Sequence, residues 1–335
     1  MVSLGLLFIC LMAGLKFYFP AYMANKCIEN GKIALNHGEY GRAVGDFSSA
    51  IQFQPENAIP YYFRGYAEEL GGMSGALADY NKAIELKPDY AAAYNNRGTL
   101  KARDHDFPGA VKDQSRALRL IPSDSDAMIP LIYYNLGSAQ IGAGEIDAAL
   151  ASLSKAIQLN PTLAVAFVER GRAKILKNDF DGAASDLAQA IKLDPNLAEA
   201  YQNQSMVKNE RKDFAGALAD ASKAIALKPG LADAYGTRGY SRNAMGNFTE
   251  AIADYSQALE LAPNNVTILC HRGDAKFAAG DFAGAMADYG QAIELQPGFA
   301  TIYDRRSAAR LKMGDVAGAQ ADLNKAQEMR KTPHP

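Results

Sequence analysis

The chain has 335 residues, of which 48% are hydrophobic and 21% are charged, a composition that excludes an intrinsically disordered protein. Its formal net charge of −2, without a continuous stripe of Lys and Arg, argues against a nucleic acid as the main partner. The three cysteines, Cys10, Cys27 and Cys270, provide no paired framework of disulfides.

The chain begins with an apolar stretch that carries no charged side chain from Val2 to Leu15. A bilayer requires about 20 apolar residues, a length that residues 1–22 reach if Lys16 extends to the headgroups and the aromatic residues after it lie at the interface. We therefore predict a membrane anchor over residues 1–22, followed by a helix that Pro20 starts or kinks.

Two questions about this segment stay open at this point. A cleaved signal peptide is the alternative to an anchor, although no Lys or Arg precedes the apolar run and no clear cleavage site comes after it. The lysines after the segment favour a cytoplasmic location of the remaining chain, but many hydrophobic leaders export the polypeptide behind them. The side of the membrane, cytoplasmic or extracytoplasmic, is therefore unresolved.

From residue 23 onward the sequence repeats, and prolines mark the period. Eight prolines close similar runs such as AIELKP and AIQLNP, namely Pro55, Pro88, Pro122, Pro161, Pro195, Pro229, Pro263 and Pro297. Successive prolines are 34 residues apart, except for spacings of 33 after Pro55 and 39 after Pro122. Each unit combines two helical patterns around a short turn. Such a hairpin cannot bury its apolar face alone, so we expect the units to stack.

The best example of the unit is Tyr235–Pro263. Small residues, Gly239, Ala251 and Ala258, are placed where the two helices should cross, and large apolar residues such as Tyr255 flank them. A period of about 34 residues with these features resembles the tetratricopeptide repeat family. The resemblance covers roughly residues 24–329 and implies an all-α, right-handed solenoid of about nine helix-turn-helix repeats behind the N-terminal anchor helix.

The spacing also divides the chain. We assign repeats one to three to residues 23–122 and repeats four to nine to residues 133–331, with a short tail at 332–335. Residues 123–132 form an irregular insertion, which either extends the first helix of repeat four or makes a bulge. In both cases we expect the array to change direction there.

A pairing of charges recurs within the repeats. Five repeats have an Arg sixteen residues before an Asp: Arg97 and Asp113, Arg170 and Asp186, Arg238 and Asp254, Arg272 and Asp288, and Arg306 and Asp322. Repeat two has the pair at fifteen residues, Arg64 and Asp79, and repeat four lacks both partners. Joint presence and joint absence predict that the guanidinium and the carboxylate meet across each hairpin.

The resemblance implies that the first helix of each repeat lines a concave groove, where positions two, five, nine, twelve and thirteen face a partner. The residues that we assign to partner binding are Tyr62, Tyr66, Asn95, Thr99, Tyr134, Ser138, Arg172, Gln202, Met206, Asn209, Tyr240, Asn243, Asp274, Phe277 and Asp304. Aromatic, amide and acidic groups in this mixture suit an extended peptide or a partner helix. Any one of them can instead be a solvated surface residue.

We predict no enzyme, and hence no catalytic residue, cofactor, metal site or small-molecule substrate. None of the histidines lies in a cluster with metal-ligand spacing. Cys270 and His271 are adjacent on one predicted helix and therefore point about 100° apart, which does not suit a Cys/His nucleophile.

The function that we expect is that of a membrane-tethered scaffold, which binds a peptide segment or helix of a partner protein in the groove. The alternative is a structural or assembly subunit of a membrane protein complex, which would use its edges and its convex face instead.

Overall fold

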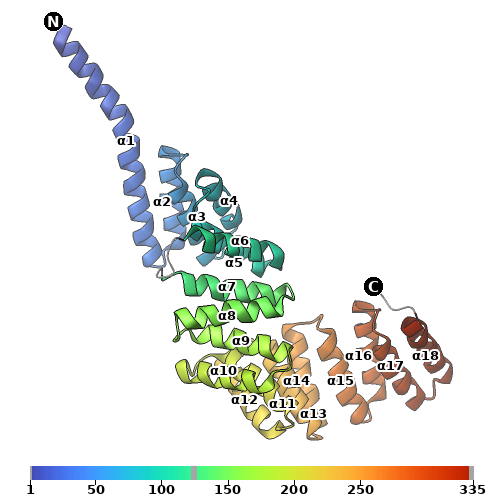
Figure 1. Ribbon diagram of the computed structural model, residues 1–335. Coiled ribbons are helices and arrows are strands. Elements are labelled where there is room, and N and C mark those ends of the chain that lie inside the picture. The colour runs from blue at the N-terminus through green and yellow to red at the C-terminus, as the bar shows by residue number, and fades with distance from the viewer. Residues whose placement is uncertain (1, 122–126, 332–335) are drawn as a thin grey trace. The chain divides into compact units, whose positions relative to one another are not determined.

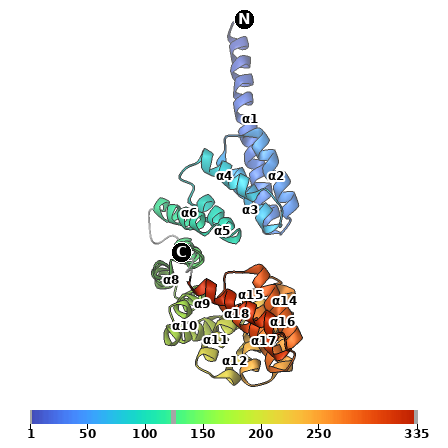
Figure 2. The same cartoon turned by 90° about the vertical axis from the view of Figure 1, so that its right-hand side faces the viewer.

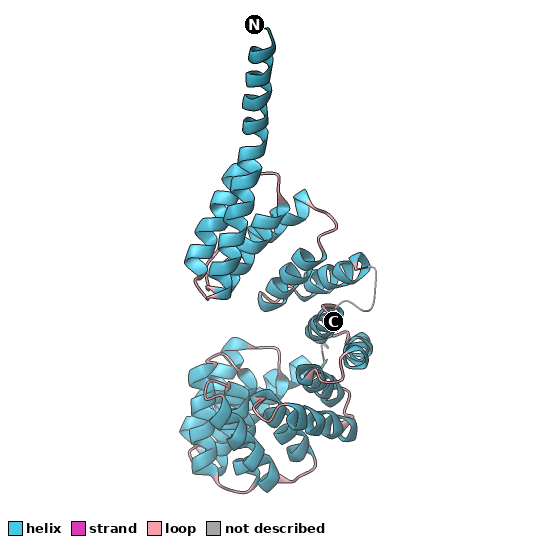
Figure 3. Ribbon diagram, turned by 90° about the vertical axis from the view of Figure 1, so that its left-hand side faces the viewer, coloured by secondary structure: helices cyan, strands magenta, loops and turns pink. Residues whose placement is uncertain are grey.

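The computed structural model describes residues 2–121 and 127–331, with side chains from residue 19 onward. These ranges form eighteen α-helices and no strand (Figure 3), which confirms the all-α prediction. The first helices of the nine hairpins are α1 (Val2–Asn36), α3 (Ala58–Leu70), α5 (Ala91–Arg103), α7 (Ile129–Gly142), α9 (Ala164–Leu176), α11 (Ala198–Glu210), α13 (Ala232–Ala244), α15 (Val266–Ala278) and α17 (Ala300–Lys312). The second helices are α2 (Tyr40–Phe53), α4 (Ala76–Leu86), α6 (Phe107–Leu120), α8 (Ile146–Leu159), α10 (Phe180–Leu193), α12 (Phe214–Leu227), α14 (Phe248–Leu261), α16 (Phe282–Leu295) and α18 (Val316–Lys331).

The chain consists of two compact units. Unit one is Met1–Pro161 and contains α1 to α8, and unit two is Thr162–Pro335 and contains α9 to α18. Within each unit, the two helices of a hairpin pack against each other, and each hairpin packs against the next one in the sequence (Figures 1 and 2). The predicted stacking of hairpins in sequence order is therefore present inside both units.

The N-terminal helix differs from its prediction. Helix α1 is continuous from Val2 to Asn36 with Pro20 inside it, so proline does not start a new helix here. The C-terminal part of α1 packs against α2, whereas its N-terminal part projects beyond that helix (Figure 1). Among the helices whose side chains are described, none offers an apolar stretch long enough to cross a bilayer. The predicted anchor at residues 1–22 lies mostly outside those residues and gains no support from the structure.

The insertion before repeat four contributes little helix. Helix α7 has 14 residues, one more than its counterparts α5 and α9, which have 13 each. Extension of the helix therefore accounts for only a small part of the added length. Most of what remains falls on residues 122–126, outside the described residues, and the predicted change of direction stays a prediction.

The hairpin of α13 and α14 shows why this sequence folds as it does. Its turn passes through Gly246 with a φ of 82°, a left-handed conformation that glycine adopts without a steric cost. Where the helices cross, a Cβ on Gly239 would lie 2.9 Å from Cε1 of Tyr255. Ala251 and Ala258 are fully or almost fully buried beside that ring. The predicted small residues thus allow the two backbones to approach around one large side chain.

All six predicted Arg–Asp pairs form. In each pair the guanidinium Nη2 is 2.7 Å from a carboxylate oxygen, and Nε bonds the other oxygen, at 2.7–3.0 Å, so the contact is bidentate. The aspartates are buried, as expected for a charge whose hydrogen bonds are provided by a fixed partner. In repeat four, Ser152 takes the place of the Asp and donates a hydrogen bond to Gln140.

A second cation completes most of these pairs, and the sequence analysis missed it. The residue four positions after the Arg approaches the same carboxylate in five pairs: Lys101, Lys174, Arg242, Lys276 and Arg310. The i, i+4 spacing places both cations on one face of the first helix. Repeat two carries Glu68 at that position, where burial and the charge of Asp79 raise the pKa of its carboxyl.

Candidate protein-binding groove

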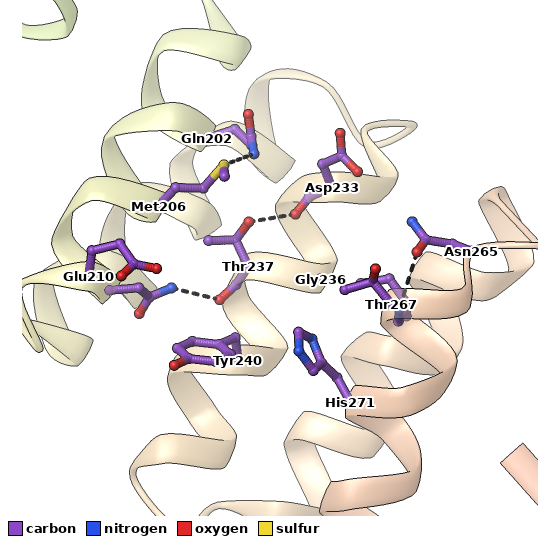
Figure 4. Close-up of a pocket in the computed structure, with 12 residues that line it drawn as sticks. Gln202, Met206, Glu210, Asp233, Gly236, Thr237, Tyr240, Asn265, Thr267 and His271 are labelled. Carbon is purple, nitrogen blue, oxygen red and sulfur yellow. Dashed lines mark hydrogen bonds between the residues drawn. The ribbon is translucent and has the colours of Figure 1, made fainter. Parts of the chain in front are cut away.

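A hollow of unit two lies on the first helices of three successive hairpins. It has a volume of about 510 Å³ and is drawn in Figure 4. Side chains from α11, α13 and α15, together with Asn265 just before α15, line it: Gln202, Met206, Asn209, Glu210, Asp233, Gly236, Thr237, Tyr240, Asn265, Thr267, Ile268 and His271. Four of the predicted partner-binding residues, Gln202, Met206, Asn209 and Tyr240, therefore meet in one site.

Gly236 creates space in the middle of this hollow. It occupies position five of its repeat, which is Gln202 in the repeat before and Cys270 in the repeat after. A Cβ on Gly236 would lie 2.6 Å from Cδ1 of Ile268. The absent side chain therefore lets α15 bring Ile268 close to the backbone of α13 at the lining of the hollow.

Hydrogen bonds hold α11 and α13 together beneath the hollow. Asn209 donates through Nδ2 to the carbonyl oxygen of Thr237 at 3.3 Å, and the Ser241 hydroxyl donates to Oδ1 of Asn209 at 2.8 Å. Asn209 and Ser241 are both buried, so these bonds satisfy groups that would otherwise be costly to bury. The main role of Asn209 is therefore to join α11 and α13, and its side chain is not available to a partner.

Aromatic and apolar groups form the exposed part of the lining. Tyr240 is 40% exposed and Met206 is 37% exposed. The ring of Tyr240 faces that of His271, with 5.8 Å between the ring centroids (Figure 4). Burial lowers the pKa of His271, with Asp274 acting against this effect, so the imidazole is neutral at neutral pH. The neutral imidazole beside Tyr240 adds aromatic surface without a positive charge.

A second hollow of about 210 Å³ adjoins the first and lies between α15 and α17. The two share Thr267 and His271 as lining residues. Its lining includes the apolar residues Val266, Phe299 and Ile302, and Phe299 is 55% exposed. We call the two adjoining hollows the α11–α17 groove.

The other predicted residues of unit two are engaged elsewhere. Asp274 accepts a hydrogen bond from the Tyr289 hydroxyl at 2.8 Å and pairs with Arg305 at 2.9 Å. Asp304 pairs with Arg330, Arg172 pairs with Glu169 at 2.6 Å, and Phe277 packs edge-on against Phe282. Asn243 is half-buried on α13 and does not line either hollow.

In unit one the predicted residues pack among themselves. The ring of Tyr62 lies 4.9 Å from that of Tyr90, 6.0 Å from that of Tyr80 and 6.5 Å from that of Tyr66, measured between centroids. Burial raises the pKa of the Tyr62 hydroxyl, as expected for a ring inside a cluster.

The polar residues predicted in unit one bond to neighbouring helices or to their own. Asn135 of α7 donates to Oδ1 of Asn95 at 3.1 Å, and Thr99 donates to the carbonyl oxygen of Asn95 at 3.1 Å. Tyr134 and Ser138 are half-buried on α7. In unit one these side chains therefore pack against their own unit, whereas in unit two the corresponding region contains a hollow.

Sequence reasoning missed part of the lining of the first hollow: Gly236, Thr237, Asn265, Thr267, Ile268 and His271. Gly236 was overlooked because a residue without a side chain offers a partner no obvious contact, yet its place at position five was readable from the period. Thr267 occupies position two of repeat eight and was readable in the same way. Asn265 precedes the helix, and no position rule of the repeat covers it.

The chemistry of the groove does not suggest a nucleophile. Cys270 is 7% exposed, and burial raises the pKa of its thiol, which disfavours the reactive thiolate. Among residues 19–121 and 127–331, no group of three or more His, Cys, Asp or Glu side chains is placed to hold a metal ion.

Comparison with known proteins identifies the repeats. Residues 69–103 and 239–278 match a family model described as TPR repeat, and residues 131–163 and 266–299 match one described as tetratricopeptide repeat. No curated protein matches the sequence significantly.

Solved structures share the fold at low sequence identity. A chain of the APC/C hetero-tetramer Cut9-Hcn1 is 14% identical, with a TM-score of 0.64 over 92% of this chain and 74% of that one. A tetratricopeptide repeat protein from Parabacteroides merdae is 19% identical, with a TM-score of 0.53 over 71% of this chain and 93% of that one. The pilF protein of Pseudomonas aeruginosa is 17% identical, with a TM-score of 0.53 over 61% and 97%. At these identities the likeness concerns the fold alone.

Proposed function

Because the chain belongs to the tetratricopeptide repeat family, we propose that it is a non-enzymatic scaffold that holds a segment of a partner protein in the α11–α17 groove. Proteins of this family bind protein or peptide partners. A groove on successive first helices suits an extended segment, which gains affinity by contacting several repeats in turn.

The observation that carries this proposal is the exposure of large apolar side chains inside a hollow. Met206 and Tyr240 are 37% and 40% exposed within a space of about 510 Å³. Tyrosine and methionine are enriched at protein interfaces, and a partly exposed Tyr gains most when a partner removes it from water. The equivalent first-helix residues of unit one instead pack against other side chains of that unit.

We also propose that the scaffold is tethered to a membrane through residues 1–22. The support is the uncharged run from Val2 to Leu15 in the sequence, which approaches the length of a spanning segment. Extraction of cell membranes with alkaline carbonate tests this tether. Retention of the full chain in the pellet, and its release when residues 1–22 are deleted, is the expected result; a full chain that is released would contradict it.

Site-specific photocrosslinking in cells tests the groove itself. A photoreactive amino acid at Thr267, which is exposed and lines both hollows, should capture a partner at one defined segment. The matched control places it at Glu294, an exposed residue on the second helix α16. A synthetic peptide of the captured segment should bind the purified chain and lose binding with Tyr240→Ala. Equal capture at both positions, or binding that Tyr240→Ala leaves unchanged, would contradict the proposal.

A further inference from the structure

We infer that the α11–α17 groove takes an extended peptide with a basic side chain in the larger hollow and a large apolar side chain in the smaller one. This inference rests on the proposed function and specifies the chemistry of the partner. The occupant is thus a segment of another protein in which Lys or Arg lies a short distance before or after a residue such as Leu or Phe.

The basic side chains of the helices around the larger hollow all form ion pairs within the chain. Helices α11, α13 and α15 carry five Lys or Arg residues in total, and all five are ion-paired with aspartates of the second helices: Lys208 with Asp220, Arg238 and Arg242 with Asp254, and Arg272 and Lys276 with Asp288. None of these cations lines the hollow. The aspartate ladder therefore leaves the hollow without positive charge.

Two carboxylates of the same hollow are not neutralised in this way. The other acidic side chains of these three helices are paired, Glu199 with Lys228 at 2.7 Å and Asp274 with Arg305 at 2.9 Å. Glu210 and Asp233 line the hollow, are exposed and have no ion-pair partner among the described residues. Unpaired carboxylates in a hollow without cations produce a negative potential that favours a cationic side chain.

The remaining lining suits a basic residue within a peptide chain. The exposed face of Tyr240 can take a Lys or Arg group in a cation–π contact. Gln202 is only 8% exposed and bonds Sδ of Met206 through Nε2 at 3.0 Å, so its amide oxygen has no partner among the described residues. An acceptor on the lining of a hollow can take a hydrogen bond from a bound segment, and a peptide N–H or a basic side chain provides the donor.

The smaller hollow provides apolar side chains that can contact an apolar residue of the same peptide. Val266, Phe299 and Ile302 line it, and its one cation, Arg305, is paired with Asp274. The two hollows share Thr267 and His271 as lining residues, so one extended segment can place side chains in both.

Selection from a displayed library of random peptides on the purified full chain tests this inference. The peptides enriched on the wild-type chain should carry Lys or Arg a short distance before or after a large apolar residue. The best peptide, made synthetically and monitored by fluorescence anisotropy, should bind the double variant Glu210→Gln with Asp233→Asn about fivefold more weakly, as expected for two solvent-exposed ion pairs. The control Glu294→Gln removes an exposed carboxylate from α16 and should change nothing.

The variant Tyr240→Ala separates the two possible failures. If peptides bind in a Tyr240-dependent way but lack a basic residue, or bind the double variant as tightly as the wild type, the inference is wrong and the proposed function survives. If no enriched peptide depends on Tyr240, the proposed function is contradicted and the inference falls with it.

Discussion

The two units of the chain use the same hairpin but treat position five of the first helix in opposite ways. In unit one this position holds Tyr62, Asn95 and Tyr134, and the ring of Tyr62 lies among those of Tyr80 and Tyr90. In unit two it holds Val168, Gln202, Gly236, Cys270 and Asp304, of which Gln202 and Gly236 line the larger hollow. The clearest contrast is therefore between Tyr62, whose ring packs in an aromatic cluster, and Gly236, which has no side chain.

The charge ladder, by contrast, is the same in both units. Arg97 and Asp113 in unit one pair with the same 2.7 Å contact as Arg238 and Asp254 in unit two. The aspartates are 2% and 4% exposed. We conclude that the ladder belongs to the hairpin itself, whereas the groove depends on residues that differ between repeats. Substitutions in the ladder and in the groove should therefore have different effects.

The largest effect is expected from breaking the ladder. Asp254→Ala strands Arg238 and Arg242 and should lower the free energy of unfolding by about 3–5 kcal/mol, the usual cost of removing one partner of a buried pair. Asp113→Ala should cost a similar amount in unit one. Urea unfolding of the full chain measures both. The control Asp233→Ala, at an exposed carboxylate of the groove, should stay within about 0.5 kcal/mol, and equal losses for Asp254 and Asp233 would reject the structural role of the ladder.

The next largest effect is expected from removing a packed tyrosine, and it is compared with the removal of an exposed one. Tyr62→Ala removes a ring that contacts three other tyrosines and should cost about 2–4 kcal/mol of stability, as for other large-to-small changes in packed regions. Tyr240→Ala removes a ring that is 40% exposed and should cost less than about 1 kcal/mol. Urea unfolding of the two variants measures both losses in the free energy of unfolding. Comparable costs would mean that the aromatic side chains of the two units play the same role.

A third change converts the open position into a filled one. Gly236→Tyr introduces at the centre of the groove the residue that unit one has at Tyr62, and it should weaken peptide binding at least about tenfold, or about 1.4 kcal/mol. The control is Gly290→Ala on α16, where a Cβ meets nothing within 4 Å. Circular dichroism checks that the variant is folded. Unchanged peptide affinity in a folded Gly236→Tyr chain would place the binding site elsewhere.

The smallest expected effect is a dependence on pH. Because burial lowers the pKa of His271 in the folded chain, the unfolded chain binds more protons as the pH falls through the ordinary titration range of histidine, near 6.5. Stability should therefore decrease as the pH falls below that range and recover above it. Asp274 acts against this shift and Arg305 adds to it. The decrease should shrink in His271→Gln; an identical pH profile for both chains would contradict this assignment.

Much of the fold was predictable because its determinants repeat. The period of prolines, the small residues at Gly239 and Ala251, and the joint presence of Arg and Asp all reflect the structure of one hairpin and recur in most copies. The second cation of most pairs, such as Arg242 beside Asp254, was not predicted, although it always lies four residues after the paired Arg. Of the two roles predicted for Pro20, starting a helix or kinking one, the first is wrong, because a proline alone does not fix where a helix begins.

The groove was less predictable because it depends on differences between repeats. Position rules selected Gln202, Met206 and Tyr240, which line the larger hollow, but they also selected Tyr62 and Asn95, which pack into their own unit. Whether a first-helix side chain is free depends on its neighbours in adjacent hairpins. For Asp274 this neighbour is Arg305 of α17, in the next hairpin, and no single repeat reveals such a contact.

Hydrogen exchange of the full chain, measured by mass spectrometry with and without a peptide selected on it, tests where a partner binds. Our account predicts that the peptide slows exchange in α11, α13, α15 and α17 and leaves α3 and α5 unchanged, with the protection lost in Gly236→Tyr. Protection centred on α3 and α5, or spread over second helices such as α14 and α16, would contradict it.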